Sequence, residues 1–251
     1  MKPSFRLLLS YILCLMATVA FWGTFHQKKI SIWPSAKGIS PPEIYTDAQE
    51  GGFSTAEFFA SDSAAAMRAV LNSGIYHPHA GIRFPLISGT RKMALDGVNF
   101  SDMDSVSITF RANADVALVL FTADPNVSKI GDPLSLRPLR MDIPATRHYT
   151  EHRISLSAIA TNPLWFDLQG IEPDSAFYLN DVVAVALESG KGTLLGLPTE
   201  IEIQKWEFFG ENRVLFRICL FILILTTSLF IWGQVKIHGK QTSKRPGDNR
   251  K

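Results

Sequence analysis

The sequence has only two cysteines, and its long central part has none. Cys14 and Cys219 both lie inside apolar runs near the two ends of the chain, whereas residues 26–213 contain no cysteine. The central part therefore has neither a disulfide nor thiol chemistry, which is compatible with an export compartment because such compartments permit disulfides without requiring them. Cys14 and Cys219 fall at different depths of their runs, so we do not expect them to pair.

Charge is absent from these two apolar runs, residues 7–25 and 218–235. Nineteen helical residues at 1.5 Å each are enough to cross the roughly 30 Å hydrocarbon core of a bilayer. The first run has the basic start of a signal peptide and a weak cleavage site at Thr18-Val19-Ala20, but it exceeds the usual h-region of about 7–15 residues. We therefore favour an uncleaved anchor, with cleavage as the alternative, and predict that the chain contacts the lipid bilayer through two spans.

The net charge of +2 combines an acidic central part with a basic tail. Residues 26–213 hold 16 basic and 22 acidic side chains, whereas the tail holds Lys236, Lys240, Lys244, Arg245, Arg250 and Lys251 against one acid. Basic ends stay in the cytoplasm, so we expect both termini there and the central part outside a bacterial inner membrane, in the periplasm. The tail could also attract anionic lipid. An acidic domain argues against nucleic acid as a partner.

These features divide the chain into six parts. The lead-in is rich in Pro, Gly and Ser at residues 31–45, which is typical of a linker. The predicted parts are a cytoplasmic stub at 1–6, a transmembrane helix at 7–25, a linker at 26–49, an exported domain at 50–211, a second transmembrane helix at 214–235 and a cytoplasmic tail at 236–251.

The exported part is a series of short apolar runs separated by turn residues. In "DSVSITFRA" (104–112) apolar side chains alternate with polar ones, and "ADVALVLFTAD" (114–124) follows closely enough to predict a hairpin. Residues 152–159, 179–190 and 199–210 also predict strands, the last with a β-bulge near Gln204 and Lys205. Only residues 54–74 suggest a helical turn. The pattern predicts a mainly β fold, an antiparallel β-sandwich or jelly roll.

Three segments resemble a known family. "IYHPHAGIRFPL" followed by "MALDGVNFSDMDSVSITFRA", then "HRISLSAIATNPLWF", then "FYLNDVVAVALESG" with its closing strand, are similar to the galactose-binding-like jelly rolls of the carbohydrate-binding-module and complex-I-intermediate-associated (CIA30-like) type. The resemblance covers roughly residues 50–210. It implies the same fold, and a role either as an exported sensor module between two membrane helices or as an assembly factor.

One short motif raises the question of zinc. His148-x-x-Glu151-His152 is the signature of one class of zinc peptidase when it lies on a helix. Here Pro144 precedes the motif and strand alternation begins by Ile154. Two histidines four residues apart lie about 13 Å apart in an extended chain, at roughly 3.3 Å per residue, and cannot share one ion. We expect a solvated strand edge, with no metal and no cofactor.

Aromatic, imidazole and guanidinium side chains supply the candidate ligand contacts. Trp165 is either a sugar-stacking platform or a plug at one end of the sandwich, and the resemblance favours the plug. His77 and His79 flank a proline beside Arg83, in what is either a surface turn or a ligand-binding loop. Arginines at 137, 140, 147 and 153 form a basic stretch that would suit a carboxylate or sulfate. The candidate ligand-binding residues are Trp165, His77, His79, Arg83, Arg137 and Arg140.

No Gly-rich phosphate loop, Gly-x-Ser-x-Gly elbow or convincing pair of carboxylates is present in the sequence. We therefore predict a membrane-anchored, non-catalytic binding or sensor module for a glycan or another polar small molecule, signalling through a separate membrane or exported protein partner. The alternative is a scaffold or assembly factor that holds another exported protein, and an anchored hydrolase ranks last.

Overall fold

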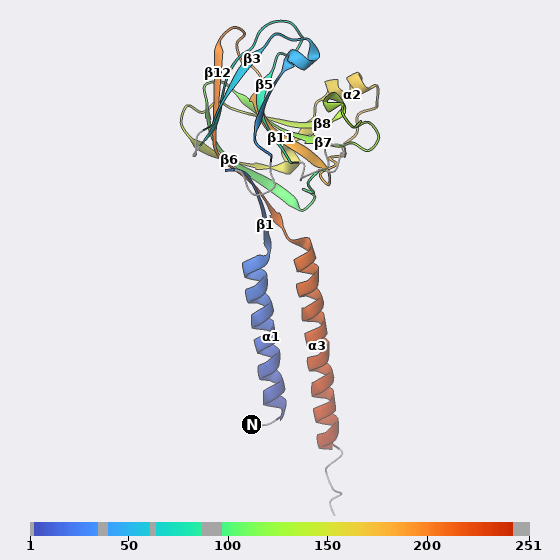
Figure 1. The fold of residues 1–251 in the computed structure, drawn as a ribbon. Coiled ribbons are helices and arrows are strands. Elements are labelled where there is room, and N and C mark those ends of the chain that lie inside the picture. Colours follow the sequence, from blue (N-terminus) through green and yellow to red (C-terminus); the bar gives the residue numbers. More distant parts are fainter. Residues whose placement is uncertain (1–2, 35–39, 61–63, 87–96, 243–251) are drawn as a thin grey trace, which may run out of the picture. The chain divides into compact units, whose positions relative to one another are not determined.

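The computed structural model describes residues 3–34, 40–60, 64–86 and 97–242. The chain divides into two compact units. One runs from residue 29 to residue 210 and is built of strands (Figure 1). The other consists of the described residues before and after it, and is built around two long helices.

The first unit is a sandwich of two six-stranded sheets. The first sheet has the order β3 (Thr55–Ala60), β4 (Ala65–Val70), β12 (Pro198–Glu211), β6 (Met103–Ala112), β9 (Thr150–Ser155), and β1 (Gln27–Trp33) also pairs with β12. The second sheet has the order β10 (Ala160–Thr161), β8 (Arg137–Ile143), β7 (Val116–Thr122), β11 (Val182–Ser189), β5 (Ala80–Pro85), β2 (Glu43–Thr46). The chain passes repeatedly from one sheet to the other, as in a jelly roll, which confirms the predicted fold class.

The core lies between the sheets and is centred on aromatic side chains. Trp206 of β12 is fully buried, and its ring meets Phe84 of β5 edge-on with 5.5 Å between ring centroids. Phe100 packs edge-on against Phe208, with their centroids 4.7 Å apart. The register of β6 on β12 shifts between Ile203 and Lys205, which confirms the predicted bulge. The bulge lets Ile203 and Trp206 both face the core.

The predicted hairpin between residues 104–112 and 114–124 is wrong, because the two strands lie in different sheets. β6 pairs with β12 and β9, whereas β7 pairs with β11 and β8. The sequence pattern explains the separation. β6 has a polar face, on which Arg111 pairs with Glu202 of β12. β7 is buried on both faces, in agreement with its almost continuous apolar run.

The predicted helical turn is also wrong for the described part of its segment, residues 54–60 and 64–74. β3 and β4 form an antiparallel pair, in which Phe58 lies opposite Met67. In β4, Ala65, Met67 and Ala69 are buried and Arg68 is exposed, so the apolar period is two residues and not that of a helix.

The sandwich begins earlier than the sequence analysis expected, since β1 and β2 both lie in the segment assigned to the linker. Ile32 of β1 is fully buried and Ile44 of β2 packs against the core. These two side chains make the lead-in part of the sandwich. Residues 35–39 of the assigned linker lie outside the described residues.

Short helices complete the unit. Helix α2 (Pro163–Gln169) is capped by the Asn162 side chain, which accepts a hydrogen bond from the Leu164 amide, and it ends at Gly170 in the left-handed conformation. The 3₁₀ helices are η1 (Asp47–Glu50), η2 (Pro133–Ser135) and η3 (Leu156–Ala158).

The second unit is a pair of helices, α1 (Pro3–Phe25) and α3 (Arg213–Thr242) (Figure 1). Residues 4–25 and 213–237 of these helices are long and apolar enough to cross a membrane. The Tyr11 hydroxyl lies 3.2 Å from the Thr227 hydroxyl, and the Tyr11 ring stacks on Phe230. Cys14 and Cys219 are both free. Residues 243–251, which hold four of the six basic residues of the tail, lie outside the described residues.

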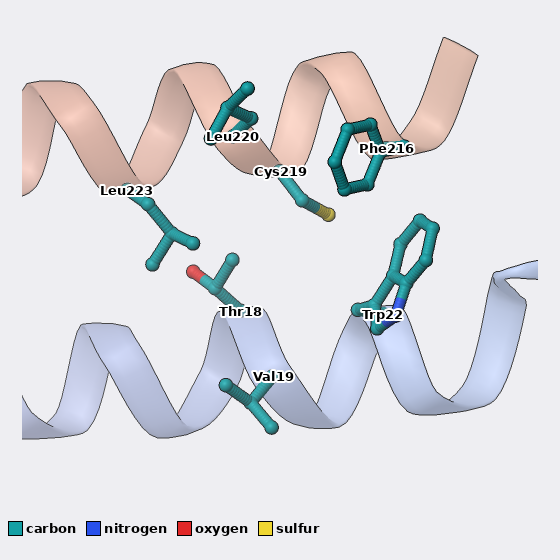
Figure 2. A pocket seen from close by; sticks show the side chains of 7 residues that line it. All are labelled: Thr18, Val19, Trp22, Phe216, Cys219, Leu220 and Leu223. Carbon is teal, nitrogen blue, oxygen red and sulfur yellow. The ribbon is translucent and has the colours of Figure 1, made fainter. Parts of the chain in front are cut away.

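A cavity of about 150 Å³ lies between the two helices. Figure 2 shows Thr18 of α1 and Cys219 of α3 pointing into this space. Trp22 and Phe216 meet edge-on at one end of the cavity, with 5.5 Å between their ring centroids. The remaining lining is aliphatic.

Candidate functional site

The outer face of the second sheet carries two rows of side chains at matching register positions. One row runs from Tyr45 through Gly81, Glu188 and Ala117 to Asp142. The next row runs from Glu43 through Arg83, Ala186 and Val119 to Arg140. Glu188 and small or branched apolar residues thus occupy the middle of the sheet, and charged or aromatic residues border them. We call this surface the Tyr45 face; it comprises Glu43, Tyr45, His79, Gly81, Arg83, Ala117, Val119, Phe121, Arg140, Asp142, Ala186 and Glu188.

Glu188 is at the centre of the Tyr45 face, and both of its carboxylate oxygens are occupied. The Tyr45 hydroxyl donates a hydrogen bond to Oε2, and Arg140 Nη1 forms an ion pair with Oε1. The Glu188 side chain is 7% exposed. A buried carboxylate needs such partners, because an unpaired charge away from water is costly. With both oxygens engaged, Glu188 is held as a structural acceptor and is poorly placed to act as a base or a nucleophile.

Tyr45 fits over the sheet because strand β5 has a glycine beneath it. A Cβ atom at Gly81 would lie 2.8 Å from Tyr45 Cε1 and 2.7 Å from Glu188 Cβ. The ring borders three other side chains. His79 lies 5.8 Å away between ring centroids, Phe121 lies edge-on at 6.0 Å, and the Arg83 guanidinium lies 5.6 Å from the ring centroid.

Burial raises the pKa of the Tyr45 phenol above its usual value, although the charges of Arg140 and Arg83 oppose the shift. Tyr45 therefore stays protonated at physiological pH and remains a hydrogen-bond donor. Arg83 Nε donates to Glu43 Oε1 at 2.9 Å, and Arg140 Nε lies 3.4 Å from Asp142 Oδ1. The face thus offers an aromatic ring, fixed guanidinium groups and carboxylates, which lie above three buried apolar residues, Ala117, Val119 and Ala186.

Three of the predicted site residues meet on this face. His79, Arg83 and Arg140 surround Tyr45 and Glu188, and the side chains of all three are between 21% and 27% exposed. His77 does not join them, since it is exposed and its ring packs against Tyr76. Only its carbonyl oxygen is connected to the face, at 3.1 Å from His79 Nδ1.

Arg137 and Trp165 lie together elsewhere, in the packing beneath α2. Arg137 is fully buried and forms ion pairs with Asp124 at 3.2 Å and with Asp174. Its guanidinium lies 4.8 Å from the Phe166 ring centroid and 5.6 Å from that of Trp165. The Arg137 hydrogen bond is the main cause that lowers the pKa of Asp174. Trp165 is 5% exposed, so it packs inside the domain, as expected of a plug, and cannot stack on a sugar in this conformation.

The motif at residues 148–152 does not lie on a helix, which the zinc-peptidase signature requires. Thr150, Glu151 and His152 belong to strand β9, and His148 precedes it, outside any helix. The His152 ring stacks on Phe110 with 4.9 Å between centroids, and Glu151 accepts a hydrogen bond from Ser107. These contacts give both residues roles within the first sheet.

Sequence reasoning missed Tyr45, Glu188 and Asp142. Tyr45 was hidden in the Pro-rich segment assigned as a linker. Glu188 carried a usable signal, since it is the one charged residue in the apolar run 182–188 and a charge there requires a partner. Asp142 follows Arg140 by two residues on β8 and belongs to the other row of the face. No sequence pattern distinguishes it from a solvated aspartate.

Comparison with solved structures finds carbohydrate-binding modules, the type of jelly roll that the sequence resembles. The family 11 module of the cellulosomal cellulase Lic26A-Cel5E of Clostridium thermocellum is 10% identical, with a TM-score of 0.49, over 73% of this chain and 94% of that one. A family 29 module complexed with cellulohexaose is 8% identical, with a TM-score of 0.42, over 74% of this chain and 92% of that one. No family model and no curated protein matches this chain. Similarity at this level assigns no ligand.

Proposed function

We propose that the sandwich is a non-catalytic module that binds a glycan on the Tyr45 face. The observation that carries this proposal is that Tyr45, Arg83 and Arg140 lie together on the outer face of the second sheet, above small apolar side chains that are buried. A sugar ring presents an apolar C–H surface and a rim of hydroxyl groups. Tyr45 and Phe121 provide aromatic surface for the former, and the guanidinium and carboxylate groups provide donors and acceptors for the latter.

Fixed geometry supports binding rather than turnover. The charged groups of the face are already paired with one another, so a hydroxyl-rich ligand meets preorganised partners and little side-chain entropy is lost on binding. The carboxylate at the centre of the face is held by Tyr45 and Arg140. A general acid or base would need a proton to exchange with the substrate.

The proposal is tested by a thermal-shift and calorimetric screen of the full chain in detergent. The first probes are cellulohexaose, the sugar in the family 29 complex, and the β-1,3-1,4-mixed-linked tetrasaccharide found in a complex of the family 11 module from Clostridium thermocellum, followed by other neutral oligosaccharides. A ligand at 100 times its dissociation constant adds about 2.7 kcal/mol, which raises the melting temperature by several degrees. Binding that disappears in Tyr45→Ala supports the proposal. Binding to no glycan, or binding unchanged in that variant, contradicts it.

We further propose that α1 and α3 anchor the module in a bacterial inner membrane with both termini in the cytoplasm. The two helices are long and apolar enough, and basic residues flank them. A fluorescent protein fused after Lys251 should then fluoresce and an alkaline phosphatase fused there should be inactive. Phosphatase activity would overturn this orientation.

Any signal from the module would pass to a separate membrane partner, which crosslinking in the membrane would capture.

A second candidate function is a scaffold that holds another exported protein, and exposed apolar side chains favour it. Phe53, Tyr76 and the Leu-rich loop before β12 are exposed, with Tyr76 at 88%. They come from neighbouring loops, since the Gly196 amide donates to Leu71 and the Asn72 side chain donates to Phe53. Apolar groups gathered in this way mark protein contacts. A stoichiometric partner lost in Phe53→Ser would favour this function.

A further inference from the structure

The opposite side of the sandwich has a cavity of its own. It measures about 230 Å³ and is lined by Arg111, Ala112, Asn113, Arg147, Glu200 and Glu202. The lining comes from the end of β6, the start of β12 and the loop before β9. It belongs to the first sheet, whereas the Tyr45 face belongs to the second.

Two of the three arginines near this cavity are already neutralised. Arg111 Nη2 donates to Glu202 Oε1 at 2.5 Å, and Arg68 donates to Glu200 Oε1 through Nε at 2.9 Å and Nη2 at 2.7 Å. The second oxygen of Glu202 accepts a hydrogen bond from Tyr149, whose ring lies 5.2 Å from the Arg111 guanidinium. These interlocked pairs hold the walls of the cavity in place.

Two charged groups in the wall of the cavity are available to bind a ligand. Within the described residues, Arg147 has neither an ion pair nor a side-chain hydrogen bond, and Glu200 Oε2 accepts no hydrogen bond. The Asn113 side chain is fixed, because its oxygen accepts from the Glu200 amide at 2.8 Å and its nitrogen donates to the Pro198 carbonyl at 2.9 Å. The cavity therefore presents one uncompensated cation and, near it, one open carboxylate oxygen.

We infer that this cavity binds a small monocarboxylate that carries hydroxyl groups, as sugar acids and hydroxy acids do. The Arg147 guanidinium matches a carboxylate in geometry and charge. Glu200 Oε2 would accept a hydrogen bond from a hydroxyl of the same molecule. The two paired glutamates disfavour a dianion, because each additional negative charge would be repelled at close range. The cavity is smaller than a typical drug site of about 300–1,000 Å³ and suits a single sugar-sized molecule.

The test uses calorimetric titration of the full chain in detergent with sodium glucuronate, at constant ionic strength. Glucose lacks the carboxylate, and sodium sulfate is an anion without the hydroxyl groups. Glucuronate should bind, and Arg147→Ala should weaken it by about tenfold or more, the effect of losing a charge-assisted hydrogen bond. Arg147→Lys, which keeps the charge but not the planar fork, should retain part of the affinity.

Two variants serve as controls. Arg153→Ala removes an arginine that is 71% exposed and does not line the cavity, so it should leave glucuronate binding unchanged. Tyr45→Ala should also leave it unchanged, which separates this site from the glycan site. Three results would each overturn the inference. These are no heat with glucuronate, equal binding to Arg147→Ala and the unmodified chain, or displacement of glucuronate by an equal concentration of glucose or sulfate.

Discussion

The Tyr45 hydroxyl donates a hydrogen bond to the carboxylate of Glu188, which lies 143 residues further along the chain. The contact joins β2, the edge strand of the second sheet, to β11 across the intervening strand β5. It places an aromatic ring over a sheet whose outer face also carries Phe121, His79 and small and charged side chains. The contact thus contributes both to the stability of the edge strand and to the shape of the proposed binding surface.

Removal of the Tyr45 hydroxyl separates these two contributions. Tyr45→Phe keeps the ring but leaves one oxygen of a nearly buried carboxylate without its donor, which should cost about 1–3 kcal/mol of stability. Glycan affinity should fall only modestly in this variant and should be lost in Tyr45→Ala. Denaturation by urea, followed by tryptophan fluorescence, measures the first quantity, and calorimetry measures the second.

The matched control is Tyr76→Ala, which removes an exposed tyrosine that does not belong to the Tyr45 face. Its stability and glycan affinity should stay close to those of the unmodified chain. If Tyr45→Ala bound glycans as tightly as this control, the aromatic ring would have no role in recognition.

A methyl group at residue 81 should displace the same ring from below. In Gly81→Ala the new Cβ would lie 2.7 Å from Glu188 Cβ and 2.8 Å from the Tyr45 ring, so at least one of them must move. Overpacking of this kind costs about 1–3 kcal/mol. We expect a lower melting temperature together with weaker glycan binding. Gly23→Ala is the control, since a Cβ there meets no atom within 4 Å. Full glycan affinity in Gly81→Ala would show that glycan binding does not depend on the position of the Tyr45 ring over β5.

The sandwich could be predicted because period-two alternation is a local property. Val106, Ile108 and Phe110 are all fully buried, as their spacing in the sequence indicates. The partners of a strand are not local. β6 and β7 are close in sequence, yet one pairs with β12 and the other with β11, and only the polarity of their second faces distinguishes them.

The site was harder to predict than the fold because it depends on which charges are buried. Arg137 and Arg140 are three residues apart in one basic stretch. The structure buries Arg137 entirely and leaves Arg140 on the outer face, on opposite sides of the same strand. The alternation within β8 carries this information, but only once the strand and its inward face are known.

Arg137 should therefore behave as a structural residue. Arg137→Met would leave the buried carboxylate of Asp124 without its ion-pair partner, which typically costs about 3–5 kcal/mol. The double variant Arg137→Met with Asp124→Asn should recover part of this loss, because no charge then remains buried. Arg153→Met, at an exposed position, should stay within about 0.5 kcal/mol of the unmodified chain. If Arg137→Met instead lost glycan affinity at unchanged stability, Arg137 would be a ligand contact.

His152 should make the stability of the sandwich sensitive to mild acid. Burial lowers the pKa of its imidazole, which stacks on Phe110 and whose Nε2 is buried without a partner in the described part of the chain. In the unfolded chain the pKa is about 6.5. A group whose pKa is lower in the folded state binds fewer protons there, so its contribution to stability is complete above pH 6.5 or so and is lost as the pH falls through the folded value.

The free energy of unfolding should accordingly decrease as the pH falls from about 7 to 5. In His152→Phe this pH dependence should be weaker, because a phenyl ring preserves the stack on Phe110 and does not titrate. His148→Gln, at an exposed position before β9, should retain the decrease of the unmodified chain. Urea titrations of the three proteins at several pH values measure the difference. Parallel pH profiles for His152→Phe and the unmodified chain would mean that the imidazole is as well solvated in the folded state as in the unfolded one, and that the stack on Phe110 does not exclude water from it.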